Sequence, residues 1–168
     1  MPNPLARAAI GSLLSVVVIA GCDRSTVNSE STRQADAEKP AVTESAPSLP
    51  RTPAPEGARV FIAEPADGAV VSSPFTVVFG AENLTIVPAG TESSEGGHHH
   101  LLVDAPLPDN LGLPIINNDS YRHFGGGQTR VELELAPGEH TLQLLLGDHL
   151  HVPHDPPIQS DVITVTVE

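Results

Sequence analysis

The sequence predicts an all-β domain, an immunoglobulin-like antiparallel β-sandwich, and two observations support this prediction. Short runs rich in β-branched, aliphatic and aromatic residues recur over residues 58–168, and turn residues separate them. Glycine and proline interrupt the same region too often for a long helical period. Six or seven short strands without helices are typical of a Greek-key sandwich, and a small barrel is the alternative.

The first two strands flank a turn. Residues 59–63 form an apolar β-rich run, and 64–68 carry proline and glycine where a tight turn favours them. The second strand is expected at 74–80. The third strand is expected at 98–104. A short strand is also expected at 113–116, at the edge of a sheet, since proline is tolerated there.

The remaining strands are expected at 129–135, 140–146 and 162–167. In the first and last of these, apolar and polar residues alternate as in a half-exposed strand. The core of the predicted sandwich is aliphatic, with Phe61, Phe75 and Phe79 added.

The N-terminal residues 1–22 resemble a bacterial lipoprotein signal peptide. Arg7 precedes an apolar run that is too short for a comfortable membrane span and ends in a lipobox-like Ile19-Ala20-Gly21-Cys22. Cys22 is the expected lipidation site. We therefore expect an exported protein, anchored by lipid to the periplasmic face of the inner or outer membrane.

Residues 23–57 are rich in Ser, Pro and Glu and show no apolar period, which predicts a disordered tether before a single domain at 58–168. The net charge is −13, and only Arg59, Arg122 and Arg130 are basic after residue 57. This charge excludes a nucleic-acid partner, because phosphate binding needs clustered basic residues. Cys22 is the only cysteine, so the folded part has no internal disulfide and no thiolate ligand.

All eight histidines lie between residues 98 and 154, mostly in three short segments. If 113–116 is a strand, Greek-key connectivity brings these segments to one pole of the sandwich; without it, His123 moves to the opposite end. The period of two in a strand places His98 and His100 on one face and His99 on the other, packed among apolar residues. His149 and His151 form a second such pair if their segment is extended.

Imidazole is the commonest metal ligand in proteins, so the pole is a candidate site for Cu(II), Zn(II) or Ni(II), or for a small polar ligand. The alternative is that these histidines donate N–H groups to loop carbonyls and only rigidify the pole. His140 is expected to be structural. The candidate metal or ligand residues are His98, His100, His123, His149, His151 and His154, with Asp148 and Asp155 as carboxylate ligands or acceptors.

Four motifs occur along the domain: GHHHLLVD at 97–104, HFGGGQT at 123–129, PGEHTLQLLLGD at 137–148 and HVPHDPP at 151–157. In this order they resemble a bacterial domain-of-unknown-function family of small exported His-rich proteins, over about residues 59–168. The resemblance implies an exported single domain with no established activity, and it assigns no catalytic residues.

Three functions remain open from the sequence. The first is a non-catalytic envelope lipoprotein whose His-rich pole binds a transition-metal ion or a small polar ligand. The second is an envelope scaffold or adhesion module that contacts protein or glycan, with structural histidines. The third is a metal-dependent hydrolase with Asp104, Asp148 or Asp155 as general base, but the sequence has no Gly-x-Ser-x-Gly motif and an enzyme is not expected. Clustered imidazoles could also charge together in acid and loosen the pole.

Overall fold

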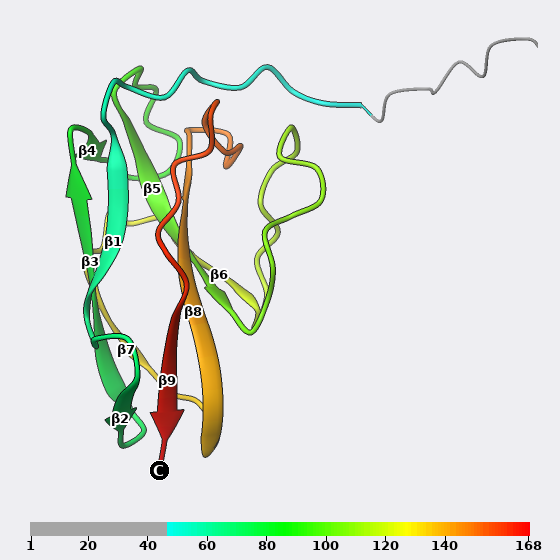
Figure 1. The fold of residues 1–168 in the computed structure, drawn as a ribbon. Helices are drawn as coiled ribbons and strands as arrows, with labels where there is room; N and C mark the ends of the chain where they lie inside the picture. Colours follow the sequence, from blue (N-terminus) through cyan, green and yellow to red (C-terminus); the bar gives the residue numbers. More distant parts are fainter. Residues whose placement is uncertain (1–46) are drawn as a thin grey trace, which may run out of the picture. The chain divides into compact units, whose positions relative to one another are not determined.

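The computed structural model describes residues 47–168, which form a two-sheet sandwich without a helix in that range (Figure 1). The smaller sheet has the order β1-β3-β7 and is antiparallel. Its strands are β1 (Arg59–Glu64), β3 (Phe75–Glu82) and β7 (Arg130–Leu133).

The larger sheet has the order β2-β9-β8-β5-β4, and β6 pairs with β5 as well. Its strands are β2 (Ala69–Val71), β4 (Thr85–Ile86), β5 (Gly96–Val103), β6 (Tyr121–Phe124), β8 (Gly138–Gly147) and β9 (Ile163–Val167). The pairs β2–β9 and β4–β5 are parallel, so this sheet is mixed, although its long central pairs are antiparallel.

The prediction of an all-β sandwich is confirmed, and six of the predicted runs are strands. The predicted edge strand at 113–116 is wrong, because these residues are irregular and the Ile115 amide donates to the His151 carbonyl rather than to a strand. The short strands β2, β4 and β6 are not among the predicted runs.

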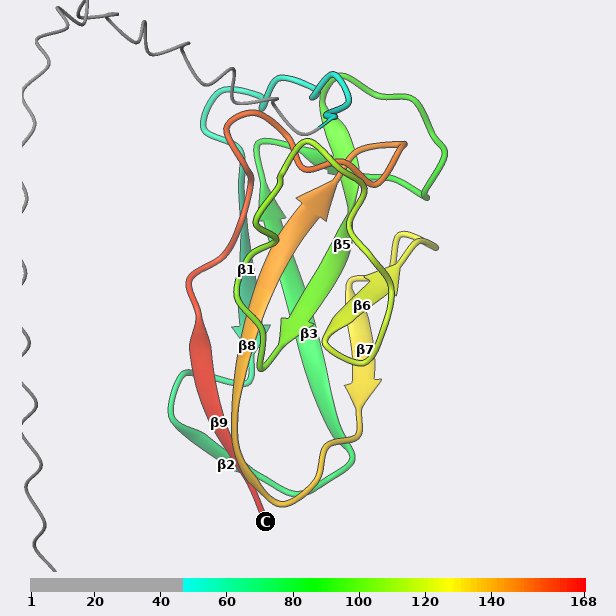
Figure 2. The ribbon, with the colours of Figure 1, turned by 90° about the vertical axis from the view of Figure 1, so that its right-hand side faces the viewer.

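Strand β5 and the second half of β8 are covered on both faces, which explains why all of β5 and the last six residues of β8 are buried. Leu142, Leu144 and Leu146 face the interior of the sandwich. Leu145 faces outward and packs with Leu102 and Ile115 under the segment that joins β5 to β6, which lies over these strands in Figure 2. A polar side chain on this outer face is therefore shielded from water.

The chain is hydrogen-bonded to the domain from Leu49 onward, before the expected domain start. The Leu49 amide donates to Gly112, and the Ala54 amide donates to Asp155. The expected tether at 23–57 is thus attached in its last part; its first part, the expected signal peptide and Cys22 lie outside the described residues. Within residues 47–168, no helix has the length and apolarity needed to cross a membrane.

Candidate metal centre

Four imidazoles meet on the outer face of the larger sheet. They belong to His98 and His100 of β5, His123 of β6 and His151 of the loop that follows β8. The six distances between their ring centroids range from 4.8 to 5.9 Å. Nitrogen atoms of His98, His100 and His123 lie within 4.8 Å of one another. We call these four residues the imidazole cluster.

Strand geometry supplies three of the four rings. His98 and His100 are two residues apart on β5 and so share a face. The antiparallel register places His123 directly opposite His100, which brings its side chain to the same face. The pairing of β6 with β5 also corrects the topological prediction for His123, because this residue joins the others although 113–116 is not a strand.

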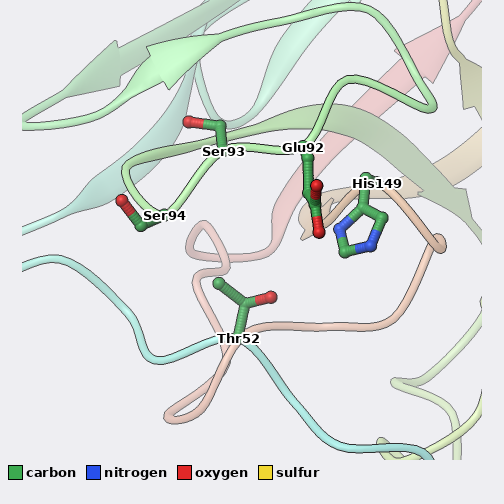
Figure 3. Close-up of a pocket in the computed structure, with 5 residues that line it drawn as sticks. All are labelled: Thr52, Glu92, Ser93, Ser94 and His149. Carbon is green, nitrogen blue, oxygen red and sulfur yellow. The ribbon is translucent and has the colours of Figure 1, made fainter.

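A turn supplies the fourth ring. Residues 148–151 do not continue β8, so the expected alternation of His149 and His151 does not apply. The His151 amide donates to the Asp148 carbonyl, and His151 has a left-handed φ of 66°. This turn aims His151 at the cluster, whereas His149 lies at a surface pocket with Thr52, Glu92, Ser93 and Ser94 (Figure 3).

The other candidate residues also lie outside the imidazole cluster. The Asp148 carboxylate accepts hydrogen bonds from the Leu150 and Val152 amides and from the Thr52 hydroxyl, so its oxygens are already engaged. Asp155 is exposed and pairs with Arg51. His154 is fully buried on the opposite side of β5, near Gly97.

The two histidines expected to be structural lie apart from the cluster. His99 faces the interior of the sandwich, with its ring centroid 5.1 Å from that of Phe79. His140 lies near the far end of β5, where its Nδ1 is 2.6 Å from an Asp104 carboxylate oxygen and its Nε2 is 2.9 Å from the Ala136 carbonyl oxygen. The hydrogen bond with Asp104 raises the pKa of His140.

Burial favours the neutral form of three rings in the cluster, those of His98, His100 and His123. His98 and His100 have no exposed surface, and desolvation lowers the pKa of His98 to about 4 and that of His100 to about 2. Desolvation also lowers the pKa of His123, and the neighbouring imidazoles add to each shift. Neutral imidazole is the form that binds a metal ion.

The buried rings lack hydrogen-bond partners within the described chain. Both nitrogens of His98 and His100, and Nε2 of His123, are buried and unpaired. An unpaired buried polar group costs about 1–3 kcal/mol. Both nitrogens of His99 and His154, which lie outside the cluster, are buried and unpaired as well.

Two glycines make room for the rings. A Cβ on Gly125 would lie 2.3 Å from the His123 ring, and a Cβ on Gly147 would lie 2.8 Å from His100 Cε1. Three consecutive glycines at 125–127 are typical of close backbone approach or positive φ, whereas nothing in the sequence singles out Gly147. The one available signal for Gly147 is its place directly before the Asp148 turn.

If the imidazole cluster binds a metal ion, replacing Gly147 by alanine should weaken that binding without removing an imidazole. The new methyl group would collide with the His100 ring and would lie 3.2 Å from the His151 Cα, so the His100 ring and the His151 backbone would have to shift. We expect the dissociation constant for Zn(II) to rise roughly 10- to 100-fold, as for other residues that orient metal ligands. Isothermal titration calorimetry with a competing chelator measures this dissociation constant.

The matched control for this change is Gly68→Ala. Gly68 has a φ of 76° and nothing within 4 Å of its would-be Cβ, so alanine there strains only a distant turn. Zn(II) affinity should stay at the wild-type value in the control. Equal affinities in Gly147→Ala and the wild type would show that the rings do not need this space.

Comparison with known proteins identifies the family. Residues 77–168, which include the whole imidazole cluster, match the family described as a domain of unknown function (DUF4399). No curated protein matches the chain. Among solved structures, the chain is similar to the fibronectin(III)-like modules of CbhA from Clostridium thermocellum, with 14% identity, 64% of this chain and 92% of that chain covered, and a TM-score of 0.30. Because the family match takes in more than half of its 168 residues, the chain belongs to the DUF4399 family.

Proposed function

We propose that this protein is a non-catalytic cell-envelope lipoprotein whose domain binds one divalent transition-metal ion, Zn(II) or Cu(II), through the imidazole cluster. The observation that carries the proposal is the convergence of four imidazoles, two of them fully buried, from three separate chain segments. The lipobox-like sequence at Cys22 supports the location in the envelope.

The spacing of the rings suits a tetrahedral ion. With metal–nitrogen distances of about 2.0–2.1 Å, the centroids of imidazoles around a tetrahedral ion are all about 5 Å apart. A square-planar ion would instead give four pairs at about 4.5 Å and two at about 6.4 Å. Five of the observed distances are 4.8–5.1 Å and the sixth is 5.9 Å, which is closer to the tetrahedral set.

Metal binding would also relieve the unpaired nitrogens. Each ligand uses one ring nitrogen, and an ion bound by His98, His100 and His123 would give a partner to a buried group on each ring. The absence of a cysteine from the described domain and the engagement of Asp148 elsewhere leave an all-nitrogen donor set, which favours Zn(II) and Cu(II) over Mg(II) or Ca(II).

If His151 adds a fourth nitrogen to those of His98, His100 and His123, the site supports binding rather than catalysis. Catalytic zinc sites keep a position open for water or substrate, whereas four protein ligands close a tetrahedral ion. His123 and His151 are only partly buried, so an ion can reach the cluster from the surface side.

Titration of the metal-free protein tests the proposal. We expect one Zn(II) per chain, competition by Cu(II), and with Co(II) the intense visible absorption of a tetrahedral ion. The variant His123→Ala should lose this spectrum, and Thr166→Val, on the exposed side of β9, should keep it. A wild-type protein that binds neither Zn(II) nor Cu(II) above background would overturn the proposal and leave the scaffold or adhesion module, with its protein or glycan partner, as the alternative.

The envelope location has its own test. Replacing Cys22 by alanine removes the acylated residue of the lipobox, so the protein should leave the membrane fraction and appear in the soluble fraction. Fractionation followed by immunoblotting measures this, with Ser25→Ala as control. Equal membrane association of Cys22→Ala and the wild type would contradict lipid anchoring.

A further inference from the structure

We propose that the segment 49–55, here called the strap, positions His151 in the imidazole cluster, so that strap docking and metal binding strengthen each other. This inference rests on the proposed function for its metal-dependent part. The strap precedes the first strand of the domain and lies against the loop that carries His151.

The first connection runs through Thr52 and Asp148. The Thr52 hydroxyl donates to one carboxylate oxygen of Asp148 at 2.8 Å. The other oxygen accepts from the Leu150 and Val152 amides at 2.9 and 3.0 Å, on either side of His151. The strap therefore fixes the carboxylate that closes the His151 turn.

The second connection runs through Arg51. Its guanidinium donates to the carbonyl oxygens of Pro153 and His154 and to the Asp155 carboxylate. Two backbone hydrogen bonds join the same segments: the Ala54 amide donates to the Asp155 carbonyl and the Asp155 amide donates to the Thr52 carbonyl, both at 2.9 Å. The far half of the loop is thus held along its main chain.

His151 depends on such support because its backbone is in an unfavourable region. A φ of 66° is strained in a residue other than glycine and persists only where neighbouring contacts hold it. The carboxylate of Asp148 and the strap supply those contacts on one side, and the Ile115 amide holds the His151 carbonyl on the other.

The coupling must be reciprocal. If docking of the strap raises the affinity of the cluster for an ion, the bound ion raises the stability of the docked strap by the same factor. The strap joins the domain to the chain that leads to Cys22. Metal binding would therefore stabilise the docked form of the segment through which the domain is attached.

The experiment compares Thr52→Val in the full chain with Thr166→Val, an isosteric change at an exposed position of β9. In the metal-free proteins, nuclear Overhauser contacts between the rings of His98 and His151 should be lost in Thr52→Val and kept in the control. With Zn(II), the dissociation constant of Thr52→Val should rise about tenfold. Arg51→Gln, with Arg59→Gln as its exposed control, should act in the same direction.

Hydrogen exchange tests reciprocity. Zn(II) should slow exchange of the Ala54 and Asp155 amides in the wild type, and much less so in Thr52→Val. Wild-type ring contacts and Zn(II) affinity in both Thr52→Val and Arg51→Gln would overturn the strap inference. A wild type that binds no Zn(II) would overturn the proposed function instead, while the metal-free ring contacts would still decide whether the strap positions His151.

Discussion

Without metal, the domain should unfold in mild acid, losing most of its stability between pH 6.5 and about 4. The cause is three fully buried imidazoles whose pKa values are lowered by desolvation: His98 and His99 to about 4 and His100 to about 2. A folded-state pKa below the unfolded value of about 6.5 means that only the unfolded chain gains these protons in this range. The stability is therefore unaffected by these groups' ionisation above pH 6.5, and it falls as the pH drops below 6.5 toward their folded-state pKa values.

The size of this loss of stability follows from the slope of the free energy of unfolding against pH. Each imidazole that protonates only on unfolding lowers the free energy of unfolding by about 1.4 kcal/mol per pH unit, so three give about 4 kcal/mol per unit. A typical domain has about 5–15 kcal/mol of stability. His140 acts in the opposite sense, because its hydrogen bond with Asp104 raises its pKa and favours the folded state in acid, but this pair is partly exposed and screened.

Urea titrations followed by circular dichroism at several pH values, with a chelator present, measure this loss. Saturating Zn(II) should move the acid midpoint downward on the order of one pH unit, because the ion binds only the folded, neutral cluster. A metal-free domain with the same free energy of unfolding at pH 7 and pH 4.5 would show that the histidines are not buried as described.

Replacing His100 by leucine should have two effects of opposite sign. In the metal-free protein, leucine removes a buried ring with two unpaired nitrogens opposite Leu145 of β8, so the free energy of unfolding should rise by about 1–3 kcal/mol. The affinity for Zn(II) should fall on the order of 100-fold or more, because a ligand is lost. A residue that weakens the empty fold but is needed for binding is what a functional site predicts.

His99→Leu is the matched control on the other face of the same strand. Its ring is equally buried and unpaired but packs against Phe79 and lies outside the cluster, so the stability should rise while Zn(II) affinity stays unchanged. Chemical denaturation and metal titration of both variants measure the two quantities. Equal Zn(II) affinity in His100→Leu and His99→Leu would contradict the assignment of His100 as a ligand.

Much of the fold can be predicted because strand signals are local. Alternation and turn residues locate six strands, and the period of two by itself separates His98 and His100 from His99. The short strands β2, β4 and β6 escape prediction because two to four residues carry too little pattern. The predicted strand at 113–116 fails because the Ile115 amide bonds to a loop rather than to a strand.

The membership of the cluster could not be predicted to the same degree. The sequence by itself determined the sandwich and the presence of many histidines in one region. It also determined that His98 and His100 share a face, because side-chain direction alternates along a strand. Only the tertiary structure decided that His123 and His151 join them, that His149 and His154 do not, and that Asp148 serves the loop. Those choices depend on hydrogen bonds between segments far apart in the chain, such as Thr52 with Asp148 and Ile115 with His151, which no local pattern encodes.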